Sequence, residues 1–165
     1  MKSPHILRAG NPRRIRDNLV GVVDQLALDA IEEALCENVR QLYALARRHY
    51  TFARRLNAPD WRHCVSRSYY SVYAAARAVR LYVRGDYSTD VKDHQKFGEL
   101  PDDFPSRDRF ANKLSVLRED RNLCDYDHTA RASDLVLGGP RAWLWRRSFL
   151  TARGRTSDGK IWDSR

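Results

Sequence analysis

One short segment in the second half of the chain carries residue types that can act on a phosphate. The segment LREDRNLCDYDH contains Arg118, Arg121, Asn122, Tyr126 and His128. A guanidinium can hold two phosphate oxygens, and an imidazole titrates near neutrality and can accept or donate a proton. We take Arg121, His128 and Asn122 as candidate catalytic residues. Arg118 and Tyr126 are candidate substrate-binding residues.

The chemistry that suits these side chains is cleavage of RNA through its own 2′-hydroxyl. The reaction needs a proton acceptor, a proton donor for the leaving oxygen, and positive charge on the developing phosphorane. His128 can fill either proton-transfer role, and Arg121 supplies a permanent charge. Asn122 can orient the histidine or the phosphate.

The spacing of Arg121 and His128 constrains how they can meet. They are seven positions apart, so on a continuous helix they return to nearly the same face but are separated by about 10 Å of rise. That distance is too long for both to touch one phosphate. Either the helix ends near Asp125 and His128 folds back, or a second subunit completes the site.

The same residues also allow interpretations without chemistry. Arg121 and Asp125 have the spacing of an ordinary salt bridge within a helix. His128 at a helix end can be a cation that interacts favourably with the carboxyl-terminal dipole, and Tyr126 can be a core residue. A charged, solvated helix end is the structure that these interpretations predict.

Hydrophobic periodicity predicts helices throughout and no strand. One apolar stripe is formed by Leu35, Val39, Leu42 and Ala46, and the next by Trp61, Val65, Tyr69, Val72, Ala76, Val79 and Val83. The expected helices span 18–57 (with a break near Asp29), 60–84, 106–125 and 141–152. Gly85 is expected to end the second helix, and residues 86–106 to form a long loop. The predicted fold class is all-α, a four- to five-helix up-down antiparallel bundle.

Composition favours a single soluble domain with a polyanionic partner. Of 165 residues, 30 are basic and 25 of these are arginine, and the net charge is +9. Arginine suits bidentate phosphate contacts, so a polyanionic partner is expected, and an arginine-rich solvated surface is the alternative. Residues 1–16 are expected to form an extended or irregular basic arm, residues 17–153 the bundle, and residues 154–165 a disordered tail.

Cysteine, histidine and hydropathy patterns limit the other function classes. The three cysteines include no CxxC pair, and no two histidines sit at ligand spacing on one helix. We therefore expect no metal, no cofactor and no disulfide framework. No segment is apolar enough to predict a membrane span, so we expect a cytoplasmic protein. His49 and His63 are expected to be surface residues.

Two segments together resemble the HEPN family of small helical bundles found in prokaryotic toxin–antitoxin and defence systems. SRSYYSVYAAARAVRLYV is similar to the tyrosine- and alanine-rich core helix of that family, and RNLCDYDH is similar to its arginine–histidine signature. The intervening DHQK resembles a basic-histidine loop of relatives, which makes His94 and Lys96 candidate substrate-binding residues. The resemblance covers roughly residues 35–150.

The resemblance implies a metal-independent endoribonuclease that leaves a 2′,3′-cyclic phosphate, with its active site at a homodimer interface. It also implies a nucleotidyltransferase antitoxin as a further partner. However, CDYD is similar to the ADYD of relatives that lack the histidine. The alternative is therefore a non-catalytic bundle that binds nucleotide or RNA, or docks a nucleotidyltransferase, and a purely structural subunit of a defence complex stays open as well. Arg62 lies on the arginine surface outside the motif, and Arg62→Ala is expected to do little to RNA cleavage.

Overall fold

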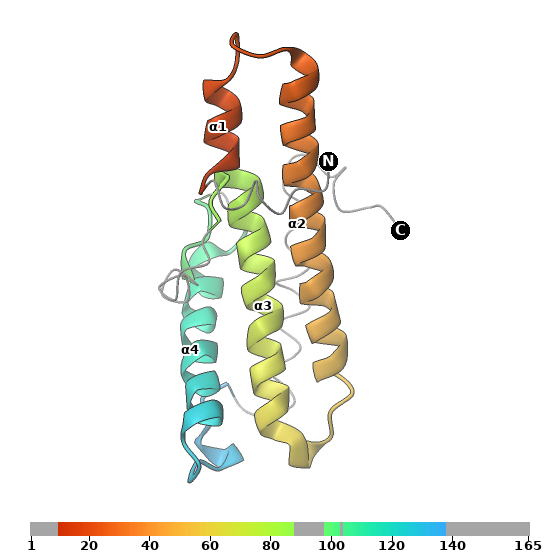
Figure 1. Ribbon diagram of the computed structural model, residues 1–165. Helices are drawn as coiled ribbons and strands as arrows, with labels where there is room; N and C mark the ends of the chain where they lie inside the picture. The colour runs from red at the N-terminus through yellow and green to blue at the C-terminus, as the bar shows by residue number, and fades with distance from the viewer. Residues whose placement is uncertain (1–9, 88–97, 103, 138–165) are drawn as a thin grey trace.

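The computed structural model describes residues 10–87, 98–102 and 104–137 as an up-down bundle (Figure 1). In this part of the chain the α-helices are α1 (Pro12–Asn18), α2 (Gln25–Ala53), α3 (Trp61–Arg84) and α4 (Arg107–Tyr126). Two short 3-10 turns, η2 (Ala58–Asp60) and η4 (Ala132–Asp134), complete the elements, and these residues include no strand. The predicted all-α fold class is confirmed.

Helices α2 and α3 pack closely because their facing surfaces are made of small residues. Ala75 and Ala78 of α3 are completely buried, as is Ala46 of α2. The hydroxyl of Ser71 donates to the backbone oxygen of Ala46 at 2.9 Å in this buried contact. The apolar residues predicted on both helices are buried in the core, apart from the partly buried Leu42 and Trp61 and from Val83, which is 41% exposed at the end of α3.

The beginning of the chain differs from the prediction in two ways. Residues 12–16, expected to be extended or irregular, belong to helix α1, which begins with Pro12 as a favourable first residue. The expected break near Asp29 is wrong, since α2 runs continuously from Gln25 and the Gln25 amide donates to Asp29 at 2.7 Å, one turn later. The chain turns before α2 instead, where Gly21 has a φ of 80°.

Helix α1 is held against the carboxyl-terminal end of α3 by one asparagine. The Asn11 side-chain oxygen caps α1 by accepting from the Arg14 backbone N–H at 2.9 Å, and its nitrogen donates to the backbone oxygen of Arg84 at 3.0 Å. Arg13 adds a 2.8 Å hydrogen bond to the backbone oxygen of Tyr82 and an ion pair with Glu32. Part of the predicted basic arm is therefore bound within the fold.

Helix α4 covers the other side of α3, and buried Phe110, Leu114 and Leu117 form its core face. The segment after α4 folds back, because the buried carboxylate of Asp120 accepts from the backbone N–H groups of Val136 and Leu137 at 2.9 and 3.0 Å. These contacts close the bundle at the end where α4 finishes (Figure 1).

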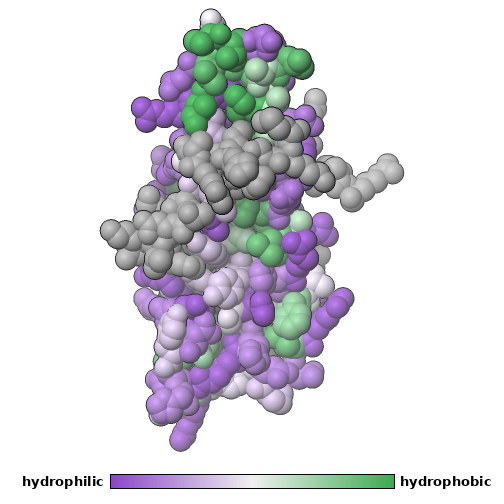
Figure 2. All heavy atoms as spheres, viewed as in Figure 1, coloured by the Kyte–Doolittle hydropathy of each residue, from purple (hydrophilic) through white to green (hydrophobic). Residues whose placement is uncertain are grey.

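Several predictions fall outside the described residues. They are the helix over 141–152, the tail over 154–165, most of the loop over 86–106, and the candidate residues His94 and Lys96. Among the described helices, none is long and apolar enough to cross a membrane. Figure 2 shows hydrophobic side chains gathered at the end of the molecule where α1 turns into α2, where Val22 and Leu26 are 73% and 79% exposed.

Gly85 offers a test of the α1–α3 junction. It ends α3 with a left-handed φ of 70°, and a Cβ there would overlap Asn11 and Arg13. We expect Gly85→Ala to lower the free energy of unfolding by about 2–3 kcal/mol, from backbone strain plus displacement of α1. Chemical denaturation measures this change.

Gly21→Ala is the matched control. Gly21 has a similar φ of 80°, but a Cβ there would meet nothing within 4 Å. This variant should lower the free energy of unfolding by only about 1 kcal/mol, from backbone strain alone. If Gly85→Ala and Gly21→Ala lowered the free energy of unfolding by the same amount, a tight packing of α1 against Gly85 would be contradicted.

Candidate functional site

Arg121 lies at the centre of the predicted motif and is fixed by contacts from two helices. One guanidinium nitrogen donates to the Tyr70 hydroxyl of α3 at 3.0 Å. The other donates to the Asn122 side-chain oxygen at 3.1 Å and to the Tyr126 hydroxyl at 3.3 Å. Nε lies 2.8 Å from a carboxylate oxygen of Asp125, without the alignment of a hydrogen bond. The side chain is only 16% exposed.

Three tyrosine rings surround the Arg121 guanidinium. Its central carbon lies 5.6 Å from the ring centre of Tyr69, 5.7 Å from that of Tyr70 and 5.2 Å from that of Tyr126. Tyr69 is buried, whereas Tyr126 is 74% exposed and is therefore not the core residue considered above. Aromatic faces attract a cation electrostatically, so the rings hold the guanidinium at the surface of α4.

The surroundings of Arg121 keep its guanidinium protonated. Burial by itself lowers the pKa of Arg121, but the hydroxyls of Tyr70 and Tyr126 and the carboxylate of Asp125 outweigh it and raise the pKa. The ion pair with Asp125 is the intrahelical salt bridge that the spacing allowed. Arg121 is thus always charged and already partly neutralised.

His128 lies beyond the end of the helix. Helix α4 ends at Tyr126, and Asp127 has an extended backbone with a ψ of 104°. The Asp127 carboxylate accepts from the backbone N–H and the hydroxyl of Thr129, and these bonds lower the pKa of Asp127, with a smaller contribution from His128. The His128 side chain is exposed. The helix therefore ends within one residue of Asp125, which the first of the two geometries requires.

Arg62 of α3 holds this helix end in place. Its guanidinium donates to the backbone oxygens of Cys124 at 2.8 Å, Asp127 at 2.7 Å and Ala130 at 2.7 Å. It also lies 4.7 Å from the ring centre of Trp61. The expectation that Arg62→Ala does little to cleavage conflicts with this structural role, since three charge-assisted hydrogen bonds fix the segment that carries His128.

His49 is a residue that the sequence interpretation missed. It lies on α2, is half-buried, and its ring centre is 5.8 Å from that of Tyr70, the tyrosine that contacts Arg121. Burial, followed by the positive charges of Arg67 and Arg48, lowers the pKa of His49. The imidazole is therefore neutral at physiological pH and can accept a proton. Its position three residues after buried Ala46, on the same helical face, was the available signal.

The structure thus joins Arg121, Asn122 and Tyr126 directly, and adds Tyr70 and His49. Arg118 is half-buried on α4, and His128 follows the helix end. The described residues contain no group of three histidine, cysteine or acidic side chains arranged to hold a metal ion. Burial raises the pKa of Cys124 to about 11, so its thiol stays protonated.

The role of Arg62 can be measured through stability. We expect Arg62→Ala to lower the free energy of unfolding by about 2–3 kcal/mol, because hydrogen bonds from a charged donor are worth more than neutral ones. His63→Ala is the control, since His63 is the exposed neighbour on the same helix and its loss should change stability by at most about 0.5 kcal/mol. Equal stability of the two variants would show that Arg62 does not hold the end of α4.

The pKa of His49 can be measured by NMR titration of its ring resonances. We expect a midpoint below the ordinary value of 6.5. The unfolded chain then binds more protons than the folded one between the two pKa values, so stability falls as the pH drops through that window. Arg67→Ala should raise the midpoint by removing a neighbouring positive charge.

Arg40→Ala is the control for that titration. Arg40 is also on α2 but pairs with Glu37 at 3.2 Å, and its removal should leave the His49 midpoint unchanged. A wild-type midpoint at or above 6.5 would contradict the burial of His49 beside these arginines.

Comparison of the chain with protein-family models, with curated proteins and with solved structures finds no match. The resemblance to the HEPN family accordingly rests on the two sequence motifs and the DHQK segment alone.

Proposed function

We propose that this chain is a metal-independent endoribonuclease in which Arg121 binds the scissile phosphate and His128 transfers a proton. The observation that carries the proposal is the fixed guanidinium of Arg121, held by Tyr70 at 3.0 Å beside the exposed Tyr126. A charged group that is positioned before substrate arrives needs no reorganisation during the reaction.

The contacts of Arg121 leave room for a phosphate to bind. A guanidinium has five N–H donors in a fixed plane. The hydrogen bonds to Asn122 and Tyr126 are exposed, whereas the bond to Tyr70 is partly buried. Phosphate oxygens can replace the two exposed partners while Tyr70 and Asp125 keep the guanidinium in place.

In the proposed step, one proton is taken from the RNA and one proton is returned to it. A neutral imidazole takes the proton of the 2′-hydroxyl, and the freed oxygen attacks the adjacent phosphorus. The bond between phosphorus and the 5′-oxygen breaks, and an imidazolium returns a proton to that oxygen. The products are a 2′,3′-cyclic phosphate and a 5′-hydroxyl end, with Arg121 neutralising the charge that develops on the phosphorane.

Two histidines are needed for this step, and two sources of the second are available. A homodimer with the residue 118–128 segment at its two-fold axis adds the partner's His128. Within one chain, His49 is connected to Arg121 through Tyr70. The HEPN resemblance favours the dimer and implies the biological setting: a cytoplasmic toxin–antitoxin or phage-defence system with a nucleotidyltransferase antitoxin.

The second candidate function is a non-catalytic bundle that binds nucleotide or RNA, or docks a nucleotidyltransferase. Two observations favour it. Asp125 lies 2.8 Å from Nε of Arg121 and competes with a phosphate for its charge. His128 is exposed, and its side chain forms no hydrogen bond or ion pair with a described residue that would orient it.

Cleavage of single-stranded RNA in the presence of EDTA separates the two candidates. We expect the purified protein to produce 2′,3′-cyclic phosphate ends and to leave DNA intact, because DNA lacks the 2′-hydroxyl. His128→Ala should slow cleavage about 10²- to 10⁴-fold, and Arg121→Ala about 10²-fold or more. Gel electrophoresis of end-labelled products measures both rates.

The controls keep charge and folding separate from chemistry. His63→Ala and Arg109→Ala remove exposed residues outside the motif and should cleave like the wild type. Arg121→Lys preserves a positive charge in case the alanine variant unfolds. Mixing the Arg121→Ala and His128→Ala chains should restore activity if the site is shared between subunits. If the wild-type protein binds RNA without cutting it, the ribonuclease proposal is contradicted and the non-catalytic function is supported.

A further inference from the structure

The net charge of the chain is concentrated in residues 38–85, which include the second part of α2, its connection to α3, and α3. Residues 38–85 contain ten arginines and one acidic residue, Asp60, so their formal charge of 10 − 1 = +9 equals that of the whole chain. The arginines are Arg40, Arg47, Arg48, Arg54, Arg55, Arg62, Arg67, Arg77, Arg80 and Arg84. Outside this range, the basic and acidic residues of the chain are therefore equal in number.

Several of these arginines have contacts inside the described fold. Arg62 holds the end of α4, Arg40 pairs with Glu37 at 3.2 Å, and Arg77 lies 4.4 Å from the ring centre of Tyr87. By contrast, the exposed residues Arg47, Arg48 and Arg55 form no ion pair with any residue that the structure describes. Since no carboxylate of the described residues pairs with them, their positive charges repel one another and favour binding of an anion.

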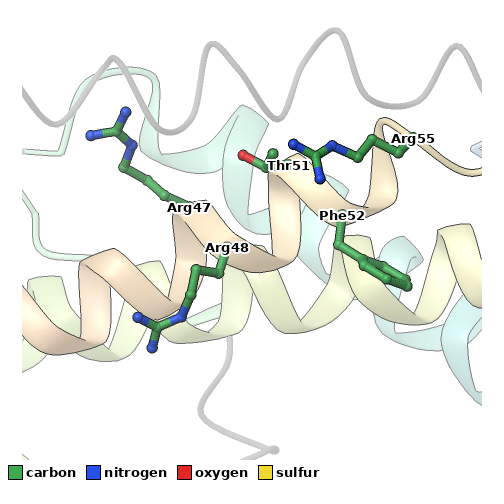
Figure 3. Close-up of a pocket in the computed structure, with 5 residues that line it drawn as sticks. All are labelled: Arg47, Arg48, Thr51, Phe52 and Arg55. Atoms are coloured by element: carbon green, nitrogen blue, oxygen red, sulfur yellow. The ribbon is translucent and has the colours of Figure 1, made fainter.

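These three arginines surround a shallow hollow on α2. The hollow has a volume of about 330 Å³ and is lined by Arg47, Arg48, Thr51, Phe52 and Arg55. Figure 3 shows Arg47, Thr51 and Arg55 along one side of the helix and Arg48 and Phe52 along the other, as expected for residues four apart. Arginine side chains thus flank an aromatic ring.

Phe52 is an unusual residue to find at this position. Its side chain is 50% exposed, and the guanidinium of Arg67 lies 5.4 Å from its ring centre. An exposed ring between phosphate-binding side chains is the arrangement with which proteins stack the bases of single-stranded nucleic acid. A double helix keeps its bases stacked inside and cannot use the ring in this way.

The hollow is connected to the Arg121 site across the bundle. Arg48 and Arg67 both act on His49, which lies 5.8 Å from Tyr70, and Tyr70 contacts Arg121. Basic and aromatic side chains therefore link Arg48 on α2 to Arg121 on α4 through His49 and Tyr70.

We propose that the hollow of Arg47, Arg48, Phe52 and Arg55 binds single-stranded nucleic acid, with its phosphates on the arginines and a base stacked on Phe52. The choice of RNA as the natural strand rests on the proposed function. The surface extends the Arg121 site and holds the part of the strand that is not cut.

The test uses fluorescence anisotropy with a 2′-O-methyl oligouridine, which has no free 2′-hydroxyl and cannot be cleaved by the proposed reaction. The triple variant Arg47→Gln, Arg48→Gln, Arg55→Gln should bind about tenfold or more weakly at low salt. Its slope of log affinity against log salt should be shallower by about 2, since each lost phosphate contact removes about 0.7 from the slope for a single strand. Phe52→Leu should bind about tenfold more weakly with an unchanged slope.

The control carries the same change of charge at three other exposed arginines: Arg14→Gln, Arg84→Gln, Arg109→Gln. It should bind nearly as well as the wild type. The proposal is overturned if the two triple variants bind alike. It is also overturned if Phe52→Leu binds normally and a duplex RNA of equal charge binds as tightly as the single strand, since the surface then recognises charge alone.

These outcomes are independent of cleavage. Weak binding by the Arg47 triple variant, with a wild-type protein that does not cut RNA, supports the binding surface and contradicts the ribonuclease. A wild-type protein that cuts RNA, with the Arg47 triple variant as active and as tight as the control, supports the ribonuclease and contradicts the binding surface.

Discussion

The close contact between α2 and α3 is the constraint on which the rest of the molecule depends. These two helices and their connection include residues 38–85, where ten arginines accompany one acidic residue, and Coulomb repulsion opposes packing such a segment on itself. Ala46, Ala75 and Ala78 are fully buried between them, which lets the backbones approach closely and gains packing energy at every turn. Most arginines of this α2–α3 hairpin are exposed or half-buried, and Arg80 alone among these ten is buried, at 5% exposed.

Aromatic rings and carbonyl oxygens take the place of carboxylates along this hairpin. Arg54 lies over Tyr50, Arg67 over Phe52 and Arg77 over Tyr73 and Tyr87. Arg62 bonds to backbone oxygens at the end of α4. Only α4 brings an acidic partner to the site, where Asp125 meets Arg121. The site is therefore formed where a basic hairpin meets a helix of mixed charge.

The sequence was sufficient to predict the parts of the fold that depend on local pattern. Periodicity predicts α3 and α4, and Gly85 ends α3 with the left-handed backbone expected of it. The break near Asp29 was predicted wrongly because an acidic residue near a helix start also stabilises the helix, here with Gln25 one turn earlier.

The candidate site was only partly predictable because several of its contacts are distant in sequence. Arg121 and Tyr126 could be chosen from their spacing. Arg62 could not, since its partners lie 62 to 68 residues further along the chain. The contact of Tyr70 with Arg121 likewise depends on how α3 and α4 pack, which no local pattern encodes.

Helix α2 separates its charges along its own axis, and this affects how partners approach. Its first half carries Asp29, Glu32, Glu33 and Glu37, whereas the part from Arg40 to Ala53 has no acidic residue. This separation gives α2 an electrostatic polarity, with its basic half toward the α2–α3 connection in Figure 1. In the field of a polyanion the protein turns before contact, so that many diffusional encounters begin with the arginine end already facing the strand.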